Sequence, residues 1–442
     1  MNGQIEISDI EKFKNKYKAN NMNKILEDSI RTNGIESICL DKEILEENEN
    51  IFNIELPKSK RYNQYESSIC WIFAGFNIIK YNIAKNLNID LEQLNLSSSY
   101  ISFFDKLEKS NNAYENIINL DKEEANLGYI NDENIFKHLI YEQGYWNLFI
   151  NIVNKYGIIP EEYMKTSEES KKFKKLENIY FDKVKKDILY LLELKNQNAS
   201  LKELRDTKET FLEENYSILA KMIGEPVNSF DFNYIDKENK AKEYKNVSPL
   251  KFKEMFLTLK LEDFVVLGNM PMYNRKFYKT YSVKYVGNIY KKSELKFLNL
   301  PIERIEDLCL KQLKEGIPIW FTTNISKYVY EEGSVLDTRI YDYQKVFGIS
   351  EMSKEEALNT HSISSEHAMS ICGAYEMNNK VIRWKVEDSY GNDDKNDGYY
   401  IMNNNFFEKY LMTIVVSKKY LSSKEIKLLD EKKILIGLNE NF

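Results

Sequence analysis

The sequence predicts an α+β protein, with a helix-rich N-terminal half and a strand-rich C-terminal part. Two observations predict this class. Between residues 70 and 248, apolar residues recur every three or four positions among charged ones, which is the helical period. After residue 249, short apolar segments are separated by turn residues, which is typical of strands. The 442 residues are 43% apolar, enough for a large core.

The first helix near the chemistry is expected from Cys70 to about Lys85. Its apolar residues at three- and four-residue spacing are Ile72, Phe73, Phe76, Ile79 and Ile83. A second helix is expected from Ser98 to Lys109, with Ser97 or Ser98 as its cap. Residues 110–248 are mostly helical in pattern and heavily charged, so we interpret them as a helical insertion.

The strand-rich part begins near Pro249. Early strands are expected at 264–267, 281–286 and 319–322, with a helix at 302–315. Later strands are expected at 368–376, 381–386, 399–402 and 413–417.

The composition excludes several classes of function. The formal net charge of −7 argues against a nucleic-acid binder, which would show a basic face. No apolar run approaches the roughly 20 residues that span a bilayer. The N-terminus has neither a basic region nor an apolar one, so no signal peptide is expected. These features predict a cytoplasmic protein without a membrane anchor.

The four cysteines are far apart and follow no metal-binding or redox spacing. They are Cys39, Cys70, Cys309 and Cys372. Neither a disulfide framework nor a metal site is indicated, and no cofactor is expected. Cys309 and Cys372 lie in apolar segments and are expected in the core. A reducing compartment would keep a reactive thiol available.

Cys70 differs from the other cysteines by its surroundings. A thiol at a helix N-terminus feels the positive end of the helix dipole, which favours the nucleophilic thiolate. Free cysteines are commonly small buried hydrophobes. However, Gln64 lies six residues before Cys70 and Trp71 directly follows it. This combination predicts a catalytic nucleophile.

The three histidines leave one good candidate for a general base. His138 falls in a helical stretch and His361 in an exposed loop. His367 alone is followed by a buried strand pattern, which would hold its ring, so it is expected to take the thiol proton. Asp388 follows the next strand and would orient the imidazole. A simple turn residue is the alternative role for Asp388.

Gln64 would donate its side-chain N–H to the developing oxyanion, together with the backbone N–H of Cys70. Taken alone, Gln64 is better explained as a surface loop residue. A glutamine, a thiol, a base and an orienting residue in this order are the components of a papain-like thiol hydrolase.

Further motifs extend this likeness over nearly the whole chain. They are Leu96–Tyr100, Phe104–Lys109, Gly144–Trp146, Asn154–Pro160, Tyr341-Asp342, Phe347-Gly348, Met352–Lys354 and Trp384–Gly391. On these residues the chain resembles the family of bleomycin hydrolase and bacterial aminopeptidase C, the oligomeric branch of papain-like cysteine peptidases.

The resemblance implies a papain-like fold along a single chain, residues 1–442. Residues 50–110 would carry the nucleophile, the helical insertion would occupy 110–248 and include cleft residues, and 249–425 would carry the base. It also implies a homohexamer whose active sites face an internal cavity. The expected activity is removal of N-terminal residues from short peptides.

The resemblance also assigns two parts of the substrate cleft. Gly144 matches a glycine whose backbone pairs with substrate in papain-like enzymes, as expected where backbone must approach closely. Residues 426–442 would form a C-terminal arm, ending in Ile434–Phe442. In the family such an arm lies in the cleft and limits access to exopeptidase substrates.

Several residues depart from the family pattern. Asp388 replaces an asparagine, Ser68-Ile69 replaces Gly-Arg, Gln143 replaces the first of two glycines, and Tyr390 replaces a tryptophan. Ser68 and Gln143 are expected to narrow the cleft or change its specificity. The arm is a few residues shorter and lacks the family's ending, which is expected to relax the exopeptidase restriction.

The predicted function is therefore an intracellular cysteine aminopeptidase for short peptides. One alternative is a catalytically weakened relative that serves as an oligomeric binding or scaffold protein, which the changed cleft residues favour. Another is a Cys-His-Asp acyl or amide transferase. The intact set of Gln64, Cys70 and His367, together with the whole-chain resemblance, favours the peptidase.

Overall fold

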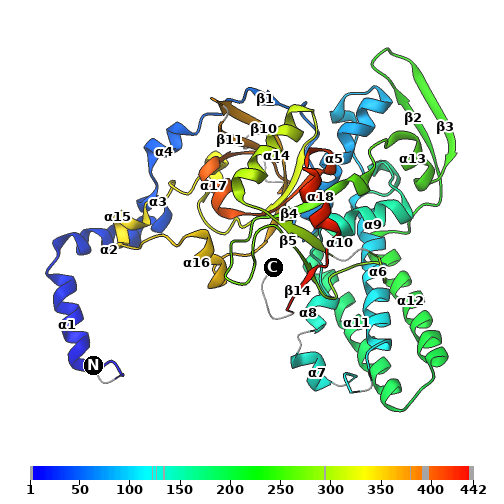
Figure 1. Ribbon diagram of the computed structural model, residues 1–442, viewed down its shortest axis with the longest axis horizontal. Coiled ribbons are helices and arrows are strands. Elements are labelled where there is room, and N and C mark those ends of the chain that lie inside the picture. Colours follow the sequence, from blue (N-terminus) through cyan, green and yellow to red (C-terminus); the bar gives the residue numbers. More distant parts are fainter. Residues whose placement is uncertain are drawn as a thin grey trace.

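The structure is a computed structural model, and it describes residues 3–121, 123–125, 127–132, 135–292, 295–378, 380–390 and 398–437. Figure 1 shows a central body that contains a large sheet, with a helical region on one side. On the other side the first two helices extend away from the body. The C-terminal segment returns toward the helical region.

The α-helices of the described residues can be given in chain order. They are α1 (Ile7–Lys18), α2 (Asn21–Asn33), α3 (Ile35–Cys39), α4 (Lys42–Glu47), α5 (Cys70–Leu87), α6 (Ser98–Ile118), α7 (Leu127–Asp132), α8 (Ile135–Leu139), α9 (Trp146–Tyr156), α10 (Glu168–Lys171), α11 (Phe173–Asn196), α12 (Leu201–Ile223), α13 (Pro249–Phe256), α14 (Ile302–Lys314), α15 (Tyr343–Phe347), α16 (Lys354–Asn359), α17 (Asn404–Tyr410) and α18 (Ser423–Asp430).

The strands belong to one large sheet and one separate hairpin. They are β1 (Ile54–Glu55), β2 (Phe230–Ile235), β3 (Ala241–Val247), β4 (Phe264–Gly268), β5 (Lys279–Val283), β6 (Lys296–Asn299), β7 (Ile319–Thr323), β8 (Val329–Tyr330), β9 (Val335–Leu336), β10 (His367–Met377), β11 (Lys380–Glu387), β12 (Tyr399–Asn403), β13 (Leu411–Ser417) and β14 (Ile434–Ile436). The large sheet has the order β14-β5-β6-β4-β13-β7-β10-β11-β12-β9-β8, with β1 on β10.

Helix α5 runs through the core of the molecule and begins at Cys70. Most of its side chains are buried, because α6 and α9 pack against it and strands β7 and β10 cover another side. No side chain caps its first turn, and Asn88 ends it in the left-handed conformation. The helix predicted for residues 70–85 is confirmed and extends two residues further. Its N-terminus therefore lies where helical and sheet regions meet.

Helices α6, α11 and α12 pack together as a helical layer (Figure 1). The Tyr114 hydroxyl of α6 donates to Asp187 of α11 at 2.5 Å and accepts from the Asn215 amide of α12 at 2.8 Å. The Ser97 hydroxyl caps α6 by accepting from the Tyr100 N–H. The helix predicted to end at Lys109 continues to Ile118, because buried apolar residues continue along the same face.

A hairpin of β2 and β3 lies within the segment expected to be mostly helical. Its signal is present in the sequence, since Phe230, Phe232 and Tyr234 alternate with polar residues at a period of two. The turn is held by Asp236, whose carboxylate accepts from two backbone N–H groups at 2.9 Å. The alternation is short, so the surrounding helical pattern obscured it.

The large sheet confirms the strands predicted between residues 264 and 417 and adds short ones that the sequence did not predict. Strand β10 pairs with β7 on one side and with β11 on the other, both antiparallel. The register places His367 opposite Thr323. Strands β6, β8, β9 and β14 have at most four residues each, which is too short for a period-two pattern to be read. The sheet thus brings the start of β10 and the end of β11 to one edge.

Candidate active site

The Cys70 thiol lies at the first residue of α5, against the start of β10. The backbone N–H of Ala368 donates to Cys70 Sγ at 3.5 Å. The side chain is partly exposed, whereas Trp71 beside it is fully buried. Unpaired amide groups and the helix dipole give this end of α5 a partial positive charge. The thiol is therefore accessible and in a place that stabilises a negative charge.

The His367 ring lies between the Cys70 thiol and the Asp388 carboxylate. Its Nε2 is 2.7 Å from Asp388 Oδ1, and the Cys70 thiol is a hydrogen-bond partner of the same ring. Both the His367 and Asp388 side chains are almost fully buried, at 2% and 4% exposure. Because Nε2 faces the carboxylate, the other ring nitrogen is the one available to the thiol.

The charges around His367 favour its protonated form. Burial acts to lower the pKa of His367, but the Asp388 carboxylate and the negative charge of Cys70 outweigh burial and raise that pKa to about 10. An imidazolium next to a thiol favours a thiolate–imidazolium pair near neutral pH.

Asp388 is held in place at the end of β11. Its Oδ1 also accepts from the Ser389 backbone N–H at 2.7 Å, and its own N–H donates to the Gly398 carbonyl at 3.1 Å. The preceding residue, Glu387, forms a buried ion pair with Lys80 of α5 at 3.2 Å. This pair ties the end of β11 to the helix that carries the thiol, so Asp388 and Cys70 are positioned together.

Gln64 lies next to the same group of residues and is buried. Its Nε2 donates to the Ser67 carbonyl at 2.8 Å, and its Oε1 accepts from the Ser389 hydroxyl at 2.7 Å. Its backbone N–H donates to the Ser389 carbonyl at 2.8 Å. The amide also hydrogen-bonds the Tyr390 hydroxyl. Ser389 thus fixes which end of the Gln64 amide faces the cleft, a relationship that sequence reasoning missed.

Tyr390 stacks on the base. Its ring centroid lies 4.7 Å from that of His367, with an interplanar angle of 29°. Burial raises the pKa of Tyr390, so its hydroxyl stays protonated. The sequence identified Tyr390 as a departure from the family but assigned it no role. The sequence held one signal for this role. Tyr390 lies two residues after Asp388, and alternate residues of an extended segment point the same way, so Tyr390 could be expected near His367.

Gly144 lies against Trp71, next to the thiol. A Cβ atom at this position would come within 2.2 Å of the indole ring. Trp71 is 1% exposed and cannot move away easily. The glycine is therefore required by close approach of the backbone.

The segment around Gly144 is held by a buried charge cluster that the sequence did not reveal. Lys109 of α6 donates to the Glu142 and Gln143 carbonyls at 3.2 and 3.0 Å and pairs with Asp105 at 2.8 Å. Lys106 forms a buried ion pair with Glu142 at 2.5 Å. The 141–145 segment is thereby fixed as part of the wall of a pocket of about 400 Å³, which Gln143 and Glu366 both line.

The remaining cysteines and His361 lie outside this arrangement, whereas His138 of α8 lines the pocket beside Gln143. Cys309 and Cys372 are buried, as predicted, and burial raises the pKa of both thiols. Cys39 is buried as well. His361 is exposed in a loop. In the described residues, no group of three His, Cys, Asp or Glu side chains could hold a metal ion.

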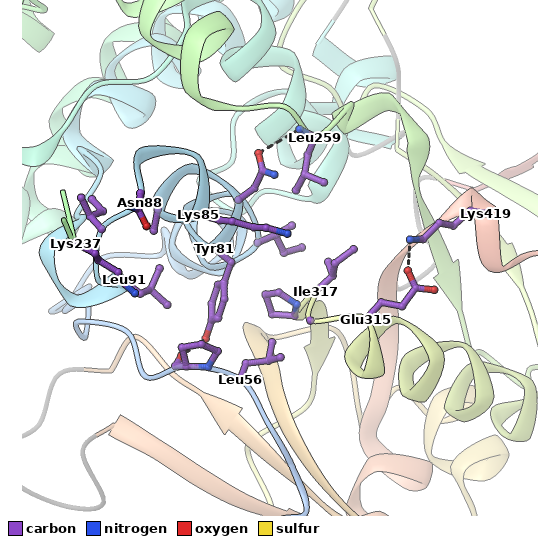
Figure 2. A pocket seen from close by; sticks show the side chains of 17 residues that line it. Leu56, Tyr81, Lys85, Asn88, Leu91, Lys237, Leu259, Glu315, Ile317 and Lys419 are labelled. Atoms are coloured by element: carbon purple, nitrogen blue, oxygen red, sulfur yellow. Dashed lines mark hydrogen bonds and ion pairs between the residues drawn. The ribbon is translucent and has the colours of Figure 1, made fainter. Parts of the chain in front are cut away.

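A larger cavity, of about 580 Å³, lies at the other end of α5 (Figure 2). Tyr81, Lys85 and Asn88 line it, together with the Glu315–Lys419 ion pair. Lys85 is roughly 22 Å along the helix from Cys70 at 1.5 Å per residue. The described lining residues include no cysteine or histidine, so this cavity does not hold the thiol–imidazole pair. The smaller pocket beside Gln143 is the one next to the chemistry.

The thiol lies at the start of the central helix and faces an imidazole, which in turn contacts a carboxylate. On this fold, that arrangement defines the class of papain-like cysteine peptidases. The sequence pattern of the Peptidase C1-like family matches residues 4–439. The chain belongs to this family. The resemblance stated from the motifs is thereby confirmed.

Known relatives are similar to this chain over almost its whole length. Aminopeptidase C of Listeria innocua is 29% identical over 99% of this chain and 98% of its own. Bleomycin hydrolase of Gallus gallus is 27% identical over 90% of this chain and 89% of its own. The crystal structure of PepW from Lactobacillus rhamnosis HN001 is 28% identical, with a TM-score of 0.93 and 98% coverage of both chains.

Proposed function

We propose that this chain is a cysteine aminopeptidase that removes N-terminal residues from short peptides. The observation that carries the proposal is the position of the His367 ring between the Cys70 thiol and the Asp388 carboxylate, 2.7 Å from the latter. The names of the relatives, aminopeptidase C and bleomycin hydrolase, support the same substrate class. Peptides are the proposed substrates, and no cofactor has a role in the mechanism.

The first half-reaction forms a thioester. The Cys70 thiolate attacks the carbonyl carbon of the first peptide bond, and the carbonyl oxygen becomes an oxyanion. The backbone N–H of Cys70 and the side-chain N–H of Gln64 that now faces Tyr390 would donate to this oxyanion. The His367 imidazolium then gives its proton to the leaving amine as the C–N bond breaks.

The second half-reaction restores the enzyme. Neutral His367 takes a proton from water, and the resulting hydroxide attacks the thioester carbonyl carbon. The C–S bond breaks, the free amino acid leaves, and the proton held by His367 re-forms the imidazolium beside the Cys70 thiolate. Asp388 accepts a hydrogen bond from the ring throughout and keeps it oriented.

The proposed function includes a C-terminal arm, and strand β14 is where this arm starts. Strand β14 pairs with β5, with Ile436 opposite Val283. Val283 also lines the pocket beside Gln143. This path supports an arm that reaches the cleft. Residues 438–442 lie outside the described residues, so the end of the predicted arm does too.

A homo-oligomer is part of the proposal, and a hexamer is its form by resemblance. Support comes from α1 and α2, which extend from the body in Figure 1. Within each helix their exposed apolar side chains are three or four residues apart: Ile7, Ile10, Phe13 and Tyr17 on α1, and Met22 and Ile25 on α2. Apolar surface of this kind is commonly covered by another chain.

A reducing, cytoplasmic location is also part of the proposal. The four cysteines are all free thiols, which is what a reducing compartment maintains. No helix in the described part of the chain is long and apolar enough to cross a membrane.

The test is hydrolysis of unblocked aminoacyl-fluorogenic amides under reducing conditions, beside the Cys70→Ala variant. Thiol-dependent release that disappears in Cys70→Ala is the expected result. No release from any amide, with Cys70 also unreactive to a thiol alkylator, would favour the binding or scaffold alternative. Transfer to added amines in preference to water would favour the transferase.

A further inference from the structure

We propose that Lys109 is a positioning residue of the peptidase. Its ammonium group holds two peptide carbonyls in the interior and thereby turns the Gly144 N–H toward the cleft, where a carbonyl group of a bound peptide accepts from it. The inference rests on the proposed peptidase function and deepens it, because it names the residue that prepares the peptide-binding wall. It also gives a function to the Phe104–Lys109 motif, which the reaction steps do not use.

The Lys109 ammonium group has three N–H donors, and the structure gives each of them an acceptor. They donate to the Glu142 carbonyl at 3.2 Å, the Gln143 carbonyl at 3.0 Å and the Asp105 carboxylate at 2.8 Å. The Lys109 side chain is 6% exposed, and its nitrogen lies 5.4 Å from the centre of the Trp71 ring. Because every donor is used inside the protein, the direction of both carbonyls is fixed.

The planarity of the peptide group transmits this direction to Gly144. The peptide bond between Gln143 and Gly144 is trans, so its carbonyl and its N–H point in opposite directions. The Gln143 carbonyl points inward, to the buried Lys109. The Gly144 N–H therefore points outward, to the side on which Gln143 and Tyr145 line the pocket of about 400 Å³.

The backbone groups of Gly144 are available to a ligand. Gly144 is buried, yet neither its N–H nor its carbonyl has a hydrogen-bond partner in the part of the chain that the structure describes. Buried backbone groups are almost always paired. An extended peptide carries both a carbonyl and an N–H, so a bound peptide supplies both missing partners.

The contacts of the neighbouring residues distinguish Lys109 from Lys106, one turn earlier on α6. The Asp105 carboxylate also accepts from the Asn288 amide at 2.9 Å, which fixes the carboxylate and with it the Lys109 ammonium group. Lys106 pairs with the Glu142 carboxylate at 2.5 Å. Lys106 therefore holds the Glu142 side chain, whereas Lys109 holds the backbone.

The test separates positioning from a purely structural role by two variants in the inactive Cys70→Ala protein. Lys109→Met leaves the Asp105 carboxylate buried without its cation, so it should lower the free energy of unfolding. Lys109→Met/Asp105→Asn removes both charges, and the amide oxygen introduced there still accepts from Asn288. We expect this double variant to regain most of the stability lost in Lys109→Met. It should nevertheless bind unblocked tetraalanine at least about tenfold more weakly than Cys70→Ala in calorimetry, because the Gly144 N–H is no longer held toward the cleft.

The matched control is Lys311→Met/Asp307→Asn. This exposed pair on α14 has the same spacing of four residues and the same distance of 2.8 Å as Lys109 and Asp105. It should bind tetraalanine as the Cys70→Ala protein does. In the active enzyme, Lys109→Met/Asp105→Asn should raise KM for tetraalanine at least about tenfold and leave kcat within about threefold, because the thiol and the base are unchanged.

The outcomes separate this inference from the proposed function. If the double variant regains affinity together with stability, the role of Lys109 is only structural and the inference is wrong. It is also wrong if wild type hydrolyses tetraalanine and the double variant keeps the same KM. If wild type hydrolyses no peptide and Cys70→Ala binds none, the proposed function fails and the inference fails with it.

Discussion

The Nε2 atom of His367 lies 2.7 Å from Oδ1 of Asp388, and both side chains are buried. A carboxylate at this distance stabilises the imidazolium by its full charge, which an amide could not do. Together with the negative charge of Cys70, it raises the pKa of His367 to about 10 despite the opposing effect of burial. The departure from the family's asparagine therefore has a direct electrostatic consequence.

The first prediction concerns the pH–rate profile. Imidazolium is the form that gives a proton to the leaving amine, so activity is lost as pH rises through the pKa of His367. Asp388→Asn removes the negative charge and lowers that pKa, which should move the alkaline limb at least about one unit to lower pH. Kinetics of an unblocked amide between pH 6 and 10.5 measure the shift. Asp182→Asn on the exposed face of α11 is the control, and an unmoved limb in Asp388→Asn would falsify the assignment.

The second prediction concerns the oxyanion donor. Gln64→Ala should lower kcat by about 10²–10³, the usual cost of one such donor. Ser389→Ala should cause a smaller loss, about tenfold, because the Gln64 amide remains but is no longer held by the Ser389 hydroxyl. Steady-state kinetics measure both. Gln197→Ala, exposed after α11, should behave as wild type. A Ser389→Ala loss equal to that of Gln64→Ala would mean that Ser389 does more than orient the amide.

The third prediction concerns Gly144. An added Cβ would overlap the Trp71 ring, so Gly144→Ala should lower the free energy of unfolding by about 1–3 kcal/mol. It should also raise KM, because the wall next to Cys70 is displaced. Gly287→Ala is the matched control, since a Cβ there meets nothing within 4 Å and the backbone does not have a positive φ. Denaturant unfolding of both variants checks the prediction, which fails if they are equally stable.

The fourth prediction concerns the stacked pair of Tyr390 and His367. Tyr390→Ala should lower kcat/KM by about 3- to 10-fold, because an aromatic pair contributes about 0.5–1.5 kcal/mol beyond burial. Tyr390→Phe keeps the ring and should retain activity within about threefold. Tyr273→Ala, at an exposed tyrosine, controls for general effects of ring removal. If Tyr390→Phe and Tyr390→Ala lose kcat/KM equally, the effect belongs to the hydroxyl group and not to the stacked ring.

Much of the fold was predictable because its signals are local. The helix from Cys70 and the strand that starts at His367 were both predicted to within two residues, since apolar periodicity over many residues is hard to mistake. The strands β6, β8, β9 and β14 were missed because each has at most four residues, too few for a period-two pattern to be recognised. The β2–β3 hairpin was missed because its alternation lies among long helices.

The sequence by itself determined the type and order of the candidate residues, Gln64, Cys70, His367 and Asp388, because chemistry requires those side chains and local patterns show which segments carry them. Only the tertiary structure decided how they meet. Ser389 holds Gln64, Tyr390 stacks on His367, and Lys109 fixes the wall beside Gly144. Each of these contacts joins two segments that no local sequence period relates. Even the nearest pair, Tyr390 and His367, lies 23 positions apart. They form because burial makes each polar group find a partner and each ring find a surface, wherever along the chain these lie.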